Sequence, residues 1–122
     1  MTKTEENLKA AFAGESQARN KYTYFAKVAR KQGFHYVAKI FKETALNEVQ
    51  HAKEEFKLLK GIGDTKENLK AAIEGEHYEN TEMYPQMEKD AEEEGNKAAV
   101  HLFKKISEVE KHHEERYKKL LE

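Results

Sequence analysis

The sequence contains no cysteine and no tryptophan, and its only proline is Pro85. Without cysteine, the chain cannot form a disulfide, a thiolate zinc site or a cysteine-ligated iron–sulfur cluster. No stretch reaches the roughly 20 apolar residues of a membrane span, and the N-terminal MTKTEENLKAA lacks the apolar core of a secretory signal. We therefore expect a cytoplasmic protein with no membrane partner.

An excess of one charge is also missing, because 22 basic side chains stand against 23 acidic ones and the formal net charge is −1. This balance argues against nucleic acid as the main partner, since phosphate recognition needs a basic surface. Glutamate, in contrast, is abundant and supplies 21 of the 23 acidic residues. With 37% charged residues and a single proline, this composition is typical of long helices with solvated faces.

Glycine-containing breaks divide the chain into four segments, each of which predicts one long helix. The breaks lie at Gly33, at residues 61–64 and at Gly95. In every segment apolar residues recur every three to four positions, as in an amphipathic helix, and glycine suits the C-terminal stop of a helix. The fold class predicted is therefore all-α, a four-helix bundle.

The two halves of the chain repeat each other. The segment NLKAAFAGE at 7–15 lines up with NLKAAIEGE at 68–76, an offset of 61 that becomes 62 further along. One residue is therefore inserted near Tyr84–Pro85, where proline should kink the helix or sit at a bulge. We expect a single domain over residues 1–122, made of helix pair 3–60 and helix pair 65–121.

Carboxylates interrupt the apolar stripes at matching places in the two halves. In two helices the interruption has the form Glu-x-x-His, which places a carboxylate and an imidazole on one helix face, a turn apart. The residues predicted to point inward are Glu15, Glu48, His51, Glu76, Glu79, Glu110 and His113.

A single Glu-x-x-His pair is a weak signal, because 21 glutamates and six histidines give about one such pair by chance. A third pair, Glu74 with His77, is rotated away from the apolar stripe and has no counterpart in the first half, so we interpret it as solvated. The other two pairs, at 48–51 and 110–113, are both inward-facing and repeated.

Five interior glutamates without counter-ions would be prohibitively costly, because each buried charge costs several kcal/mol and like charges repel. Two divalent cations would offset this cost. A donor set rich in oxygen, with two imidazoles, suits iron or manganese, and one Glu from each of two helices plus Glu-x-x-His from each of the others is the di-iron carboxylate arrangement. The alternative is a plain bundle whose interior glutamates form salt bridges.

At these residues the sequence closely resembles the di-iron domain of rubrerythrins, over essentially the whole chain. A second glutamate one turn after Glu76, at Glu79, is the specific element of this resemblance. The resemblance implies a ferritin-like fold, two iron ions per site with manganese or zinc as substitutes, and a hydrogen peroxide reductase of the NADH- and rubredoxin-linked type. The matching segments are Ala11–Ala18, Asn47–His51, Glu74–Asn80, Met83–Pro85 and Glu108–Tyr117.

The resemblance also implies roles for individual residues. Glu48 and Glu110 would bridge the irons, Glu76 and His113 would serve one iron, and Glu15 would serve the other. The second iron would exchange His51 in the reduced state for Glu79 in the oxidised state, which makes these two the catalytic candidates. Tyr22 and Tyr84 match positions near the site and would either donate hydrogen bonds there or pack as ordinary aromatic residues.

Two departures from the family bear on partners. Rubrerythrins usually carry a rubredoxin-like domain with four cysteines, so either a separate rubredoxin-type protein donates electrons here or the chain is a cut-out domain. The break at residues 61–64 is also short: the return path between the second and third helices is roughly 35 Å, whereas four or five extended residues span about 17 Å. We therefore predict a domain-swapped homodimer, the alternative being a partly unwound linker that closes one chain on itself.

Two other functions stay open: a ferroxidase or iron-handling protein related to ferritin, and a regulatory bundle in which the metal is structural. The remaining histidines, His35, His101 and His112, are expected at the surface, and the acidic run at 88–94 is expected to form a solvated helical face.

Overall fold

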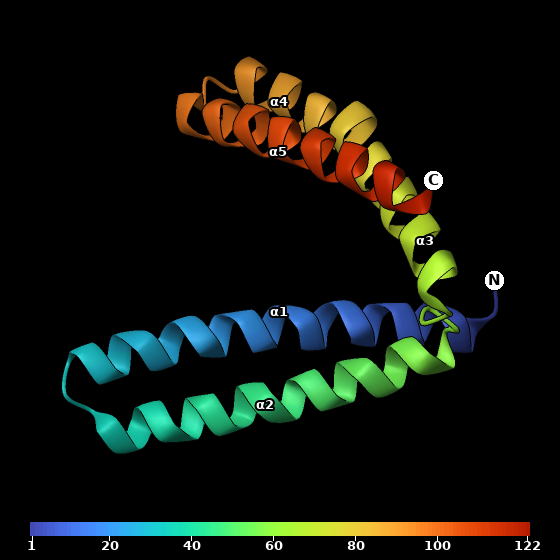
Figure 1. The fold of residues 1–122 in the computed structure, drawn as a ribbon. Coiled ribbons are helices and arrows are strands. Elements are labelled where there is room, and N and C mark those ends of the chain that lie inside the picture. The colour runs from blue at the N-terminus through green and yellow to red at the C-terminus, as the bar shows by residue number, and fades with distance from the viewer. The chain divides into compact units, whose positions relative to one another are not determined.

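The computed structural model describes all 122 residues and consists of helices joined by short turns (Figure 1). The chain divides into two compact units, Met1–Ile62 and Gly63–Glu122. Each unit is a pair of helical segments that run in opposite directions. The predicted all-α class is confirmed, and the chain has the four long helical segments that a ferritin-like bundle requires.

The first unit is a hairpin of α1 (Lys3–Lys31) and α2 (His35–Leu58). The two helices approach closely because their contact line is built from small residues. The aromatic rings of Phe12 and Phe56 stack beside this line, with centroids 4.8 Å apart. The buried residues of the unit are Ala26, Ala29, Ala38, Ala45 and Ala52.

The turns of the two units match, as the repeat predicts. Gly33 and Gly95 both have a left-handed backbone, with φ of 87° and 72°. In each case the glycine N–H bonds to a carbonyl three residues back, and the next N–H bonds to one five residues back, which is a Schellman motif. Because φ is positive, glycine is the residue that fits both positions.

The second unit contains α3 (Thr65–Tyr78), the π-helical turn η1 (Glu79–Met83), α4 (Tyr84–Glu93) and α5 (Lys97–Leu121). Its first three elements form one continuous segment that packs against α5. Asp64 caps α3: its Oδ1 accepts from Glu67 N–H, and Glu67 Oε1 accepts from Asp64 N–H, a complete capping box.

The bulge expected near Tyr84–Pro85 is present as η1, just before these residues. A π-helical turn holds one more residue than an α-helical turn, so it absorbs the inserted residue. Tyr84 N–H donates to Glu79 O, five residues back, but Pro85 has no N–H to offer Asn80 O. Ser107 Oγ on α5 donates to that carbonyl instead, at 3.1 Å.

The stop of α2 differs from the prediction. The residue with left-handed backbone is Lys60, with φ of 59°, and not the glycine that follows it. Gly61 is needed for a different reason, because a Cβ there would overlap the ring of Phe56. Spacing alone could not reveal this close approach.

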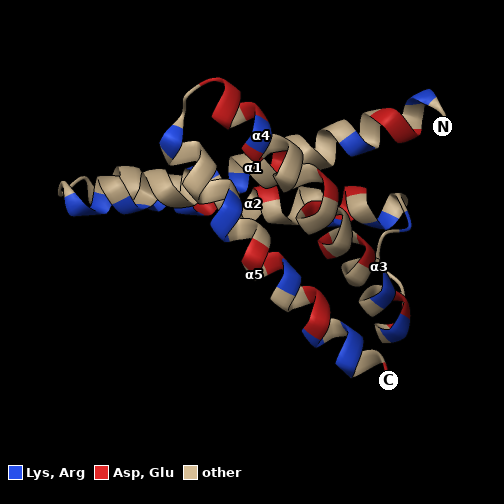
Figure 2. Cartoon of the chain, turned by 90° about the horizontal axis from the view of Figure 1, so that it is seen from above, with Lys and Arg blue, Asp and Glu red and all other residues tan.

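None of the helices combines the length and the apolar character that a bilayer crossing requires. Basic and acidic residues both occur along the helices (Figure 2). The three histidines expected at the surface, His35, His101 and His112, are exposed. In the acidic run at 88–94 only Ala91 is buried, which agrees with a solvated face.

Candidate metal centre

Each unit contains one cluster of two glutamates and one histidine. In the first unit α1 supplies Glu15, and α2 supplies Glu48 and His51. His51 Nδ1 lies 3.2 Å from Glu15 Oε2 and 4.0 Å from Glu48 Oε2. One ligand atom from each residue lies within 4.8 Å of the others, close enough for a single cation to contact all three.

The second cluster occupies the equivalent positions of the repeat. Here α3 supplies Glu76, and α5 supplies Glu110 and His113. His113 Nδ1 lies 3.3 Å from Glu76 Oε1, and the three ligand atoms again lie within 4.8 Å of one another. Six of the seven residues predicted as ligands are thus brought together in threes.

The electrostatics of the first cluster favour a cation. A hydrogen bond with Glu15 is the main reason that the pKa of Glu48 is raised above its ordinary value; burial and the charge of Glu15 add to the rise, and His51 opposes it. Two carboxylates held this close repel each other when both are ionised. A metal ion between them would remove the repulsion and keep both deprotonated.

The second cluster fits a metal for a different reason. Glu76 Oε2 is buried and has no hydrogen-bond partner, which is costly for a carboxylate oxygen unless it binds a cation. Two carboxylates and one imidazole per cluster form a donor set suited to iron or manganese, and competent for zinc. Both clusters are therefore compatible with a di-iron site.

Burial differs within the site. The five cluster residues other than His51 are half-buried, whereas the His51 side chain is 53% exposed. The second cluster is more enclosed, and its His113 side chain is 42% exposed.

Three predicted site residues lie outside the clusters. Glu79 is half-buried at the start of η1 and is not among the residues whose ligand atoms converge. Tyr22 stacks on Phe41 with ring centroids 5.9 Å apart, and Tyr84 packs on Phe103 at 6.0 Å. Both tyrosines therefore take part in aromatic packing.

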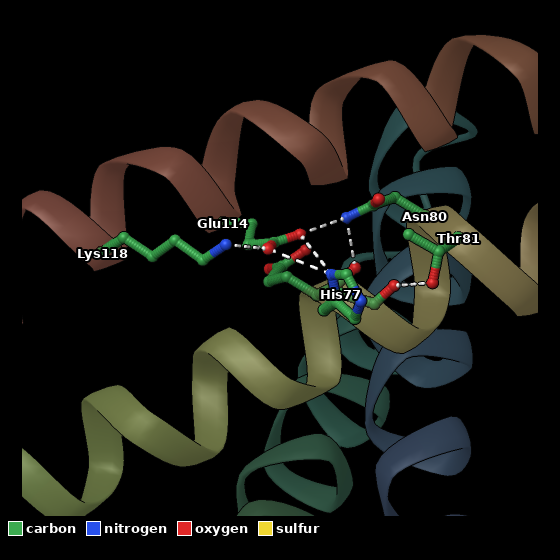
Figure 3. Close-up of polar contacts among 6 residues, drawn as sticks. His77, Asn80, Thr81, Glu114 and Lys118 are labelled. Carbon is green, nitrogen blue, oxygen red and sulfur yellow. Dashed lines mark hydrogen bonds and ion pairs between the residues drawn. The ribbon is translucent and has the colours of Figure 1, made fainter.

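A polar network around Glu114 was not predicted (Figure 3). Glu114 is only 6% exposed, and its carboxylate accepts from Asn80 Nδ2 at 2.9 Å and pairs with Lys118 Nζ at 2.6 Å. His77 Nδ1 lies 3.1 Å from Glu114 Oε2, so this histidine pairs with Glu114 and not with Glu74. The Asn80 hydrogen bond, followed by Lys118 and His77, lowers the pKa of Glu114 to about 2 against the desolvating effect of burial.

A second carboxylate was also overlooked. Glu55 Oε1 is buried without a hydrogen-bond partner. It lies seven residues after Glu48, and therefore on the same face of α2. The repeat could not reveal it, because the equivalent position is Tyr117.

Known proteins resemble this chain along nearly its whole length. A family profile described as rubrerythrin matches residues 6–121. Rubrerythrin-1 of Clostridium acetobutylicum is 47% identical, over 98% of this chain and 70% of that protein. Rubrerythrin of Porphyromonas gingivalis is 47% identical, over 98% of this chain and 66% of that protein.

Among solved structures, fully reduced nigerythrin (all ferrous) is 40% identical, with a TM-score of 0.48, over 96% of this chain and 65% of that one. The chain thus spans about two thirds of the length of the proteins it matches.

Proposed function

The chain belongs to the rubrerythrin family, and from this premise we propose that it is a di-iron peroxidase that reduces hydrogen peroxide to water. Family membership supports the broader statement, a di-iron ferritin-like oxidoreductase. The observation that carries the proposal is the pair of matched Glu–Glu–His clusters, accompanied by the additional carboxylate of Glu79. Ferritin-like iron handling would need no such additional carboxylate.

The metal ligands we propose are the six cluster residues together with Glu79. Glu48 and Glu110 would be shared by the two ions, Glu76 and His113 would hold one, and Glu15 would hold the other. His51 and Glu79 would exchange at that second ion as it is reduced and oxidised. A neutral imidazole suits a ferrous ion, and an added carboxylate suits a ferric ion.

When bound, two ferrous ions supply the two electrons that cleavage of the O–O bond in hydrogen peroxide consumes. The reaction also takes up two protons and releases two water molecules. When Glu79 has replaced the imidazole at the ion, His51 Nδ1 can carry a proton and donate it to Glu15 Oε2, which lies 3.2 Å away. Its exposure gives the imidazole access to water, from which the proton can be restored.

Residues 1–122 contain no cysteine with which to hold a rubredoxin-type iron, so the electrons would reach this domain from outside it. We propose a separate rubredoxin-type donor. The partner would be recognised in a steady-state assay in which peroxide is consumed only when both proteins are present.

We further propose that residues 1–122 act as one ferritin-like di-iron domain that is completed in a domain-swapped homodimer. The non-helical link from residue 59 to 64 is short for the return path. The first helix pair buries only alanine, the second buries only Ala91 and Glu114, and both leave large apolar side chains exposed, among them Val37 and Leu102. Residues 1–62 carry 12 basic and 7 acidic side chains, and residues 63–122 carry 10 and 16, so helix pairs from two chains would attract each other.

Stopped-flow mixing tests the activity. The iron-loaded, reduced protein would be mixed in parallel with hydrogen peroxide and with oxygen, and oxidation would be followed by absorbance. The peroxidase proposal expects oxidation by peroxide at least about a hundred times faster than by oxygen. Faster oxidation by oxygen, with retention of further iron, would instead identify a ferroxidase.

A further inference from the structure

Side chains donate hydrogen bonds to three backbone carbonyls in and just before the π-helical turn η1. Asn80 Nδ2 donates to Glu76 O at 2.6 Å, and Thr81 Oγ1 donates to His77 O at 2.6 Å. The Asn80 carbonyl accepts from Ser107 Oγ on α5. The turn is therefore held by these side-chain hydrogen bonds in addition to its backbone bond from Tyr84 N–H to Glu79 O.

The amide of Asn80 also reaches across to α5, where it donates to Glu114 Oε1 at 2.9 Å (Figure 3). His77, on the other side of Glu79 in the sequence, contacts the same carboxylate. Lys118, one turn along α5, fixes Glu114 from the opposite side. Both residues that flank the Tyr78–Glu79 peptide are thus tied to one buried carboxylate.

We propose that Asn80 and Glu114 form a clamp across the two helical segments that holds the π-helical turn in place and thereby positions Glu79 for the metal centre. The backbone of Glu79 lies inside the loop that the Asn80–Glu76 hydrogen bond closes, so any change in this turn redirects its side chain. Asn80 and Glu114 are positioning residues in this scheme and touch no substrate. The role given to Glu79 rests on the proposed function.

Amide hydrogen exchange of the metal-free protein, residues 1–122, tests the clamp directly. Asn80→Ala and Glu114→Gln should each raise exchange at least tenfold at amides 80–84 and leave α1 unchanged. Glu115→Gln is the matched control, because Glu115 is the exposed neighbour of Glu114. Exchange within twofold of wild type in both variants would overturn the clamp. Should Glu114→Gln not fold, Asn80→Ala and Ser107→Ala supply the same test.

A redox titration of the iron-loaded protein tests whether the clamp acts through Glu79. At a fixed potential, Asn80→Ala should raise the ratio of ferrous to ferric protein at least threefold over wild type, and Glu79→Ala should raise it at least tenfold. The double variant should show the same ratio as Glu79→Ala alone. Fully additive shifts, or no shift in Asn80→Ala or in Glu79→Ala, would overturn the positioning role. If the exchange and redox results are as expected but peroxide oxidises the protein only slowly, the peroxidase function is refuted and the clamp is supported.

Discussion

His113 and Glu114 are adjacent in sequence but serve different parts of the molecule. Consecutive residues of an α-helix point about 100° apart. His113 therefore faces Glu76 and Glu110, whereas Glu114 faces α3 and η1 and accepts from Asn80. The first role could be predicted, because Glu-x-x-His is visible within a single helix. The second could not, because Asn80 and His77 lie 34 and 37 residues away from Glu114.

The buried carboxylate of Glu114 makes stability depend on pH. Its folded pKa of about 2 lies below the ordinary value of 4.5, so its contribution is fully present above pH 4.5 and is lost as the pH falls toward 2. In urea unfolding of the metal-free protein, we expect Glu114→Gln to lower the free energy of unfolding by about 2 kcal/mol at pH 7. The difference from wild type should shrink below pH 4.5. A pH-independent difference would contradict this account.

Replacing His113 should weaken metal binding more than replacing its neighbour. His113→Ala removes one imidazole donor from the second cluster, and we expect the apparent metal affinity to fall about tenfold to a hundredfold. His112→Ala is the control, since this side chain is exposed and pairs only with Glu115, at 3.8 Å. Competition with a chromophoric chelator measures both affinities, and equal losses in the two variants would argue against a ligand role for His113.

Glu79 and Glu82 lie in the same π-helical turn but differ in burial, since only Glu82 is exposed. If Glu79 is the exchanging ligand, Glu79→Ala should slow oxidation by peroxide about tenfold or more while the protein still binds metal. Glu82→Ala should react at the wild-type rate. Single-turnover oxidation combined with metal analysis separates the two effects. Wild-type turnover in Glu79→Ala would remove this residue from the mechanism.

At the scale of helices, the repeat and the residue spacing predicted the helical segments well, but they did not predict the backbone conformation at every helix end. The four helical segments, the stops at Gly33 and Gly95, and the bulge in the third segment all agree with sequence-based expectations. The bulge begins at Glu79, a few residues before the proline that signals it, because a missing N–H affects carbonyls one turn earlier. The left-handed residue at the end of α2 was misplaced because a nearby glycine served a steric purpose instead.

Lys60 offers a route to greater stability. A non-glycine residue in the left-handed region raises the free energy of the folded state by about 1 to 2 kcal/mol. Glycine avoids this strain, although part of the gain is lost because glycine gives up more conformational entropy on folding. We expect Lys60→Gly to raise the free energy of unfolding by about 0.5 to 1 kcal/mol in denaturant titration. Gly33→Ala is the reciprocal variant: φ is 87° and a Cβ there would meet no atom within 4 Å, so any loss is due to the backbone alone. Destabilisation by Lys60→Gly would refute the explanation.

At the scale of the whole molecule, each helix pair leaves apolar side chains exposed, and the central question is what buries them. Val28 of the first unit is 55% exposed and Val109 of the second is 44% exposed, although both are apolar. Surfaces of this kind are normally covered by another apolar surface. The short link between α2 and α3 predicts that a helix pair of another chain buries these side chains, but the sequence alone does not establish which chain does so.

Lengthening that link should change the oligomeric state. An insertion of 12 Gly/Ser residues between Gly61 and Gly63 adds up to about 40 Å of reach, enough for one chain to close on itself. The swapped-dimer proposal expects wild type to be a dimer and the long-link variant to contain monomer, by light scattering after gel filtration. The same insertion at Gly33 should leave the dimer intact. A monomeric wild type would refute the swap.

The separation of the chain into two units whose helices are neighbours in sequence also bears on the order of folding. Hairpins of adjacent helices have low contact order and form within microseconds to milliseconds. If the bundle is completed by hairpins from two chains, their joining is a second-order encounter, and its rate should rise in proportion to protein concentration. Refolding should therefore show a fast phase independent of concentration, followed by a slower one that accelerates as the solution is made more concentrated, and iron uptake should follow the slower phase.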